Sequence, residues 1–477
     1  MVVGEFAEQR ELIIIGGGPG GYNAAIRAAQ LGVQVTLIEK AELGGVCLNK
    51  GCIPSKVHTH AAKQLASISN FKSLGISTGE ASFDYDQLTK YREKTVTQLR
   101  KGVEALCTQN QIEVVKGTAN FLAENRIGVE IGHRFEMFEF KHAIIATGSS
   151  SDIPERFQNH KDRLLVADTV YNHNEMPEEL IVCGRDAISL EVAFSFHQLG
   201  ANVSIVLDGE TDFPFDGTIN RELKRILKKE KINVYRGYTI DKLTPSEQIV
   251  EISLSKDGKA KDISGTHVYV ETKQQPMIDS LGAERIGIRI TNDGYIDIDS
   301  QMRSTVKHIF AVGDVTAGTP SALKAIKQGK VAAEIIAGLQ SEADFTFIPT
   351  VVHSTPPIAS VGLTETEAIE QGYNVKTSQF SHSGNSYAMI ANEKNGVTKL
   401  IKDVDTDLLL GYHAIGAGAI ELVNTGVTAL EMVGRDEDLR FPMYPHPSFN
   451  ETILEAVEGL TESAIHIPPR KKKETTL

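Results

Sequence analysis

Glu11-Leu-Ile-Ile-Ile-Gly16-Gly-Gly18-Pro-Gly-Gly21 is the stretch that decides the fold. An apolar run leads directly into glycines spaced as G-x-G-x-x-G, and a helix-like segment and a second apolar run ending at Glu39 follow. Gly16 permits a sharp turn, Gly18 lets the backbone approach a pyrophosphate, and Gly21 lets helix and sheet pack closely. The helix N-terminus favours phosphate, and Glu39 can hold a ribose hydroxyl. The stretch predicts a dinucleotide-binding unit rather than a glycine-rich loop without function.

The same unit recurs 168 residues later, as Glu179-Leu-Ile-Val-Cys-Gly184. It aligns without gaps onto the first copy, but only its turn glycine, Gly184, is kept. The other two glycine positions hold Asp186 and Ser189, and the acid position holds Leu207, with Asp208 one place later. The chain therefore contains two nucleotide-type folds, of which the second is degenerate.

Length and composition limit the class of protein. A chain of 477 residues is too long for a single core, and 41% hydrophobic with 23% charged residues is typical of a globular protein. The net charge of −13 argues against nucleic-acid binding, and no apolar run is long enough to predict a membrane span. Acidic residues near the N-terminus argue against a signal peptide, and four cysteines are too few for a disulfide scaffold. We expect a cytoplasmic protein.

We predict an α/β fold with two Rossmann-like, three-layer nucleotide-binding domains and a C-terminal α+β dimerisation domain. Helices are expected near 83–111 and 322–339, and strands near 141–148, 268–271 and 309–314. Further helices are expected near 364–370 and 420–433. The predicted boundaries are 1–150 and 277–346 for the two parts of the first domain, 151–276 for the second, 347–466 for the third, and 467–477 for a basic, solvated tail.

Cys47-Leu-Asn-Lys-Gly-Cys52 places two thiols just after the first nucleotide unit. Pro54 belongs in the first turn of a following helix, and a helix N-terminus lowers the pKa of a nearby thiol. A metal site would need further ligands at short spacing, and only the isolated Cys107 and Cys183 remain. We therefore predict a redox-active disulfide, no metal site, and two inert cysteines in the core.

Near the C-terminus, His446 precedes Glu451 by five residues. A histidine held by a carboxylate is a suitable base for an attacking thiol. Alone, the segment Ser448-Phe-Asn-Glu451 is better explained as a capping box that opens the last helix. The cysteine pair makes the catalytic interpretation the stronger one.

Together these motifs closely resemble dihydrolipoamide dehydrogenase, a member of the pyridine-nucleotide disulfide oxidoreductases. The resemblance runs from about residue 11 to about residue 458, and its most specific part is Gly44-Gly-Val-Cys-Leu-Asn-Lys-Gly-Cys-Ile-Pro-Ser-Lys56. Leu48 and Ser55 are similar to the lipoamide branch rather than to glutathione reductase. The chain also lacks the additional C-terminal cysteines of mercuric and large thioredoxin reductases.

The resemblance implies FAD as cofactor and a homodimer in which the third domain lends His446 to the partner's disulfide. Cys52 would face the flavin as a thiolate, and Cys47 would exchange with the dithiol of a lipoyl-bearing protein or a small substrate. A 2-oxoacid dehydrogenase-type complex is an implied partner. The implied FAD residues are Gly16, Gly18, Gly21, Glu39, Lys56, Ala119, Asp314 and Ala322. Lys56 is expected to pair with Glu191. Gly184 and Glu191 are the residues implied on the NAD-binding side.

The chain departs from this family mainly in the NAD half. Asp186 would set a carboxylate where the NAD pyrophosphate approaches, and Lys273-Gln274 replaces a Gly-Arg pair. Tyr444 and His353 replace a usual histidine and a usual phenylalanine. Three interpretations stay open: a dehydrogenase that still uses NAD+, a flavin-linked thiol oxidoreductase with another redox partner, and a non-catalytic subunit of a lipoyl multienzyme complex. We expect a dihydrolipoyl dehydrogenase-like oxidoreductase in which NAD use is in doubt.

Overall fold

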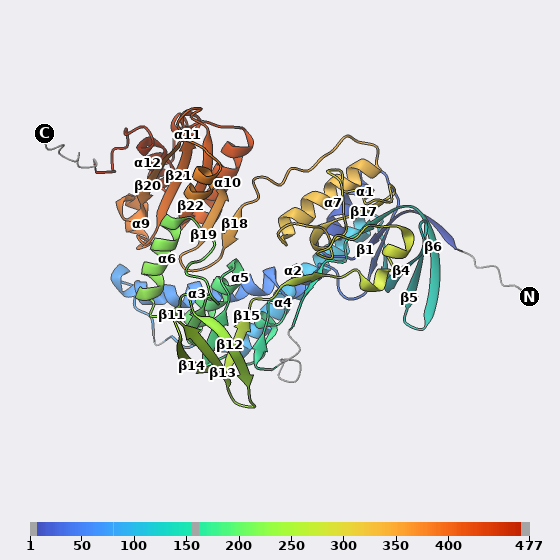
Figure 1. The fold of residues 1–477 in the computed structure, drawn as a ribbon, viewed down its shortest axis with the longest axis horizontal. Helices are drawn as coiled ribbons and strands as arrows, with labels where there is room; N and C mark the ends of the chain where they lie inside the picture. Colours follow the sequence, from blue (N-terminus) through green and yellow to red (C-terminus); the bar gives the residue numbers. More distant parts are fainter. Residues whose placement is uncertain (1–6, 80, 154–161, 469–477) are drawn as a thin grey trace, which may run out of the picture.

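The computed structural model describes residues 7–79, 81–153 and 162–468, and its sheets gather in three regions (Figure 1). The first sheet has the order β3-β2-β1-β6-β5-β4, with β17 pairing to β6. Strands β3, β2, β1, β6 and β17 pair in parallel, whereas β4, β5 and β6 form an antiparallel meander. Its strands are β1 (Glu8–Ile15), β2 (Val35–Glu39), β3 (Glu113–Lys116), β4 (Thr118–Ala123), β5 (Arg126–Ile131), β6 (Arg134–Ile145) and β17 (Ile309–Ala311).

Both faces of this sheet are covered, which is why β1 is a continuous apolar run rather than an alternating one. Leu12 and Ile14 pack with helices on one face, and Ile13 and Ile15 pack under the meander on the other. The helices of this region are α1 (Pro19–Gln30), α2 (Gly45–Asn49), α3 (Cys52–Phe71), α4 (Tyr85–Gln109) and α7 (Ala322–Ile336), with short turns η1 (Lys72–Leu74), η4 (Asp279–Leu281), η5 (Glu284–Ile286) and η6 (Gly313–Val315).

The second region repeats this plan. Its parallel sheet has the order β11-β10-β9-β15-β8, and the antiparallel sheet β12-β13-β14 packs on one face. Helices α5 and α6 cover the other face. The elements are β8 (Leu164–Leu165), η3 (Val170–Asn172), β9 (Glu179–Cys183), α5 (Ala187–Leu199), β10 (Asn202–Val206), α6 (Gly217–Lys229), β11 (Asn233–Tyr235), β12 (Thr239–Pro245), β13 (Val250–Lys256), β14 (Lys259–Gly265) and β15 (His267–Val270).

The two parallel sheets correspond strand for strand, β9 taking the place of β1 and β15 the place of β6. This agrees with the sequence repeat and with the predicted α/β class. Between the two regions the chain crosses twice, where β7 (Ser149–Ser151) pairs with β16 (Gln274–Pro276). Helix α3 of the first region packs against α5 of the second, so the cysteine segment lies close to the second nucleotide unit.

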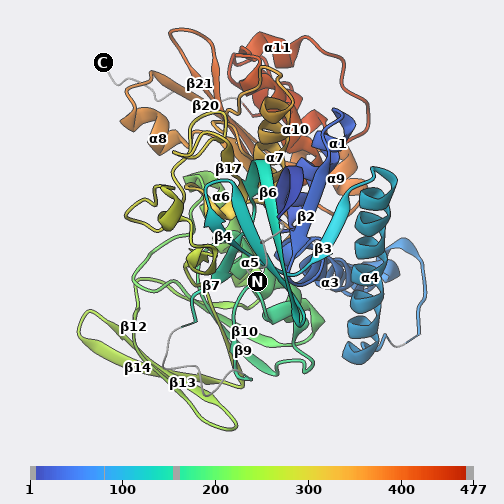
Figure 2. The same cartoon turned by 90° about the vertical axis from the view of Figure 1, so that its right-hand side faces the viewer.

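The C-terminal region is an antiparallel sheet of order β18-β19-β22-β21-β20 with helices packed on it. Figures 1 and 2 show it as the orange and red part, and Figure 2 shows the β12–β14 hairpins projecting at the opposite end. Its elements are β18 (Thr350–Val352), β19 (Ile358–Gly362), α8 (Glu365–Glu370), β20 (Val375–Ser381), η7 (His382–Gly384), α9 (Ser386–Ile390), β21 (Val397–Asp403), β22 (Leu409–Ile415), α10 (Ala419–Glu431), α11 (Asp436–Arg440) and α12 (Glu451–Gly459).

Some elements differ from their predicted bounds. The strand expected near 141–148 begins already at Arg134, because its first half pairs with β5, and it ends at Ile145. Helix α7 ends at Ile336, before Gly338 takes a positive φ. Most of the predicted tail, residues 469–477, lies outside the described residues. Among those described, no helix is long and apolar enough to cross a membrane.

Candidate functional site

The cysteine segment is fastened to the first nucleotide loop. The amide of Gly44 donates to the carbonyl of Gly17 at 2.8 Å, and Gly44 and Gly45 both have positive φ. A Cβ on Gly45 would lie 2.7 Å from the Cα of Gly18, so only glycine allows this approach. The Asn49 amide donates to the carbonyls of Leu43 and Gly45. The loop that presents Cys47 is therefore held to the first nucleotide loop by backbone contacts and by the Asn49 side chain.

The two thiols are free and differ in acidity. Cys47 lies within α2, and Cys52 is the first residue of α3, so Pro54 lies in the first turn as expected. The hydrogen bond from Cys47 lowers the pKa of Cys52 to about 7, and the Lys56 ammonium acts in the same direction against burial. The same hydrogen bond and burial raise the pKa of Cys47. Cys52 is thus the thiol that ionises first.

Glu191 of α5 joins three segments of the chain beside the cysteines. Its carboxylate pairs with the Lys56 ammonium at 2.8 Å and accepts from the Ser55 hydroxyl at 2.6 Å. It also accepts from the amide of His353, which follows β18, at 2.8 Å. The Glu191 side chain is 5% exposed. The expected Lys56–Glu191 partners are therefore in contact, and Glu191 connects all three regions.

Two glycines of the first nucleotide loop leave no space for a side chain, and the third, Gly18, faces open space. A Cβ on Gly16 would collide with the carbonyl of Ala146, and one on Gly21 with the carbonyl of Gly16. A Cβ on Gly18 would meet no atom nearer than 3.8 Å, so the space above Gly18 is open. Helix α1 starts at Pro19 without any side-chain cap. Glu39 accepts from the amides of Gly17 and Ala41, both at 2.7 Å.

These residues fit the FAD that the resemblance implies. The open space at Gly18 and the uncapped α1 terminus suit a pyrophosphate, and the Glu39 carboxylate stands at the end of β2. Asp314 in η6 accepts from the Ser149 hydroxyl at 2.9 Å, Ala119 is buried in β4, and Ala322 is the first residue of α7. The structure does not bring Ala119 into contact with the cysteine segment.

His446 and Glu451 are in direct contact. The Nδ1 of His446 lies 2.7 Å from the Glu451 carboxylate, which also accepts from the Ser448 amide. Although burial acts the other way, these hydrogen bonds lower the pKa of Glu451. Helix α12 begins at Glu451 with Asn450 as N-cap and no side-chain cap, so the full capping box does not form. The His446 side chain is 73% exposed, and within the described residues it bonds to neither cysteine.

Two carboxylates, those of Glu271 and Asp186, bond to the second nucleotide loop. Glu271, directly after β15, accepts from the amides of Arg185 at 2.7 Å and Asp186 at 3.2 Å. Asp186 caps α5 by accepting from the amide and the hydroxyl of Ser189. Burial and the Glu271 charge raise the pKa of Asp186 to about 6. A Cβ on Gly184 would lie 2.7 Å from the Glu271 Cβ.

Glu271 is the residue that sequence reasoning missed. The sequence placed it at the end of a strand but did not indicate that it contacts Arg185, 86 residues away, in the loop whose motif glycines are replaced. Gln274, which replaces the expected arginine, is also turned inward: its side chain bonds to Ser149 and Ser151 of β7. The Arg185 guanidinium reaches Glu210 at 3.5 Å.

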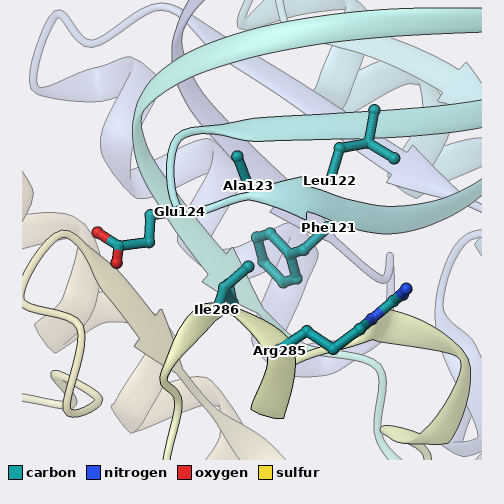
Figure 3. Close-up of a pocket in the computed structure, with 6 residues that line it drawn as sticks. All are labelled: Phe121, Leu122, Ala123, Glu124, Arg285 and Ile286. Atoms are coloured by element: carbon teal, nitrogen blue, oxygen red, sulfur yellow. The ribbon is translucent and has the colours of Figure 1, made fainter.

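A pocket of about 350 Å³ opens elsewhere, between the end of β4 and η5 (Figure 3). Phe121, Leu122, Ala123, Glu124, Arg285 and Ile286 line it. None of these is among the predicted site residues, and the pocket holds no titratable pair suited to thiol chemistry.

Comparison with known proteins gives the class to which this fold and site belong. The sequence family "Pyridine nucleotide-disulphide oxidoreductase" matches residues 10–329, and its dimerisation domain matches residues 348–457. The chain belongs to this family. A dihydrolipoyl dehydrogenase of Geobacillus stearothermophilus is 37% identical over 98% of this chain and 99% of its own length. That of Bacillus subtilis is 35% identical over 98% and 100%. The flavoprotein disulfide reductase RclA of Escherichia coli has the same fold, with a TM-score of 0.84 at 23% identity over 94% of this chain and 99% of its own.

The comparisons make the chain a dihydrolipoyl dehydrogenase-like flavoprotein disulfide oxidoreductase with FAD as cofactor, as predicted. The dimerisation domain indicates a homodimer. The roles of individual site residues and the use of NAD+ stay predictions.

Proposed function

We propose that this enzyme oxidises a dihydrolipoyl-type dithiol through Cys47, Cys52 and FAD, and passes the electrons to an acceptor other than NAD+. The contact of Glu271 with the amides of the second nucleotide loop is the observation that supports an acceptor other than NAD+. The lipoyl-bearing protein of a 2-oxoacid dehydrogenase-type complex is the proposed dithiol donor, and a cytoplasmic location stays a prediction.

The dithiol half has every group that the reaction needs. His446 of the partner subunit removes a proton from one substrate thiol, and the resulting thiolate attacks the Cys47 sulfur of the disulfide, releasing Cys52 as a thiolate. The second substrate thiol then attacks the mixed disulfide, so the substrate leaves as a disulfide and Cys47 as a thiol. Glu451 keeps the His446 ring oriented and stabilises its positive charge. FAD, when bound, accepts the two electrons from the enzyme dithiol.

The exposure of His446 supports its role in a partner subunit. A catalytic base that is 73% exposed in the single chain is free to be covered by a second copy. These intact groups weigh against a silent subunit.

The second nucleotide unit places the carboxylates of Glu271 and Asp186 at the start of α5, where the negatively charged pyrophosphate of NAD would bind. A dinucleotide pyrophosphate needs the amides at the start of α5, and Glu271 holds that of Asp186 as well as that of Arg185. In the first unit Glu39 holds only the amide of Gly17, the counterpart of Arg185. Two like charges ~4 Å apart cost about 4 kcal/mol at an effective dielectric of ~20. Half of that weakens binding roughly thirtyfold, at ~1.4 kcal/mol per decade. Gln274, bonded to β7, is not available to compensate.

The test is to mix the purified holoenzyme anaerobically with dihydrolipoamide, and separately with NADH and NADPH, while following the flavin absorbance. We expect rapid reduction by dihydrolipoamide and none by either nucleotide at millimolar concentration. The Cys47→Ser variant is the control and should lose reduction by dihydrolipoamide. Rapid reduction by NADH would overturn the closed-loop proposal. Failure of dihydrolipoamide in the wild type would overturn the dithiol assignment instead.

A further inference from the structure

Two histidines far apart in the sequence meet at the end of the second parallel sheet opposite the nucleotide loop. His173 follows η3, and His267 is the first residue of β15, whose other end leads to Glu271. Their Nε2 atoms are 3.1 Å apart, although 94 residues separate them. Glu175 lies two residues beyond His173, and a carboxylate oxygen of Glu175 lies within 4.8 Å of one ring nitrogen of each histidine. His267 is buried, His173 is half-buried and Glu175 is exposed.

The hydrogen bonds around His267 fix which of its nitrogens carries the proton. The Thr266 hydroxyl donates to the Glu179 carbonyl at 3.0 Å and accepts from the Glu179 amide at 3.1 Å. Only a lone pair of the hydroxyl oxygen is left for the Nδ1 of His267, which lies 3.1 Å away. Nδ1 therefore holds the proton, and Nε2 presents a lone pair toward His173. Such an oriented second nitrogen is characteristic of metal-binding histidines.

The spacing of the two nitrogens matches a shared metal ion. In tetrahedral zinc sites the Zn–N bonds are 2.0–2.1 Å long, so two histidine nitrogens on one ion lie about 3.3 Å apart. The observed 3.1 Å is close to this separation. Two imidazole nitrogens and one carboxylate oxygen are ligands that suit Zn²⁺, and Mg²⁺ prefers a shell of oxygens.

We propose that His173, His267 and Glu175 bind one Zn²⁺ ion, with water in the fourth position. The ion would tie the segment after η3 to the start of β15 and stabilise the second region. The neighbouring charges of Asp162 and Arg163 have opposite signs, so Glu175 supplies the net negative charge at the site. The Arg163 guanidinium is held by the carbonyl of Glu247 at 3.0 Å, and so does not occupy the ligand positions. This proposal does not rest on the proposed function.

The experiment measures zinc on the full-length holoenzyme. The protein is treated with a chelator, the cysteine pair is oxidised so that its thiols cannot bind metal, and Zn²⁺ is titrated by calorimetry. Metal content is then measured after desalting. We expect one Zn²⁺ per chain, no binding of Mg²⁺, and a thermal midpoint that rises with Zn²⁺.

Matched variants locate the ion. His173→Asn and Glu175→Gln change half-buried or exposed ligands and should fold, and each should weaken Zn²⁺ binding at least tenfold. Thr266→Val removes the hydroxyl that orients His267 and bonds to the Glu179 backbone, and it should weaken binding about 10–100-fold. His133→Asn, in the exposed turn between β5 and β6, should bind as the wild type does. Absence of Zn²⁺ from the wild type, or equal binding by His173→Asn, would overturn the proposal.

Discussion

The carboxylate of Glu271 accepts a hydrogen bond from the backbone amide of Arg185 at 2.7 Å, in the loop where a dinucleotide-binding fold receives a phosphate. In the first nucleotide unit the corresponding helix, α1, begins with a glycine N-cap and no side-chain cap. In the second, α5 begins with Asp186, whose carboxylate caps the helix. In the first copy Glu39 likewise accepts from the amide of Gly17, the counterpart of Arg185, but no side chain caps α1. In the second copy Glu271 also accepts from the amide of Asp186, and Asp186 itself caps α5, so two acids stand where the first copy is open to a pyrophosphate.

Opening the second loop should create nucleotide binding. In the double variant Glu271→Ser with Asp186→Gly, the amides of residues 185 and 186 are released and both negative charges are removed. We expect the Kd for NADH to fall at least roughly thirtyfold, which corresponds to ~2 kcal/mol. Fluorescence titration of the oxidised holoenzyme with NADH measures this. Glu251→Ser, which removes an exposed acid of β13, is the matched control and should change nothing. If the double variant binds NADH no better than the control, the closed loop is not what excludes the nucleotide.

Asp186 should make stability depend on pH. Its pKa of about 6 in the folded chain lies above the ordinary 3.8, so the folded chain holds this proton more tightly than the unfolded chain. Stability from this group is therefore lost as pH rises from 3.8 to about 6, and the loss stays constant above that window. Asp186→Asn keeps a capping side chain and should raise stability at neutral pH by about 1–3 kcal/mol.

The check on Asp186 is a series of thermal midpoints between pH 5 and pH 8. The gain of Asp186→Asn over the wild type should shrink as pH falls below about 6. Asp262→Asn, an exposed change on β14, should show a small difference that does not vary with pH. A gain that is the same at every pH would mean that Asp186 keeps its ordinary pKa.

Local motifs were predictable from the sequence, and contacts between distant segments were not. The glycines at 16, 18 and 21 act within one turn, so their spacing alone indicated the first nucleotide unit. Cys52 at the start of α3 followed in the same way from Pro54. Glu271, by contrast, meets Arg185 only because β15 pairs with β9, a pairing that the sequence pattern does not specify. His173 and His267 also meet across 94 residues, which no local pattern indicates, and Lys56 and Glu191 were paired only through the family resemblance.

The acidity of Cys52 should depend on Cys47. Thiolates react with iodoacetamide and thiols do not, so the alkylation rate of Cys52 in the dithiol enzyme should rise with a midpoint near its pKa of about 7. Cys47→Ser replaces the thiol donor by a hydroxyl in a different position. If the hydrogen bond is lost, the midpoint should rise by about one to two pH units, because a hydrogen bond to a charged group is worth ~1.5–3 kcal/mol.

Peptide mass spectrometry follows this alkylation at residue 52 across the pH range. Cys107→Ser alters a buried cysteine of α4 and should leave the midpoint unchanged. An unchanged midpoint in Cys47→Ser would show that the thiol of Cys47 is not what lowers the pKa of Cys52.

His446 should act on the disulfide of the other subunit. His446→Gln should lower the rate of dihydrolipoamide oxidation by about 10²–10⁴-fold, the range for loss of a general base. Glu451→Gln should lower it less, because the imidazole remains and only its orienting carboxylate is lost. Tyr444→Phe removes a hydroxyl that donates to the carbonyl of Leu439, and it should retain activity.

Mixed dimers decide whether the base comes from the partner. A dimer of one Cys47→Ser chain and one His446→Gln chain combines, at one of its sites, an intact cysteine pair from one chain with an intact His446 from the other. Co-expressed and purified mixed dimers should therefore oxidise dihydrolipoamide, whereas either parent homodimer should not. If each site were built within a single chain, every site of the mixed dimer would lack a cysteine or the histidine. Mixed dimers as inactive as the parents would then show that His446 serves its own chain.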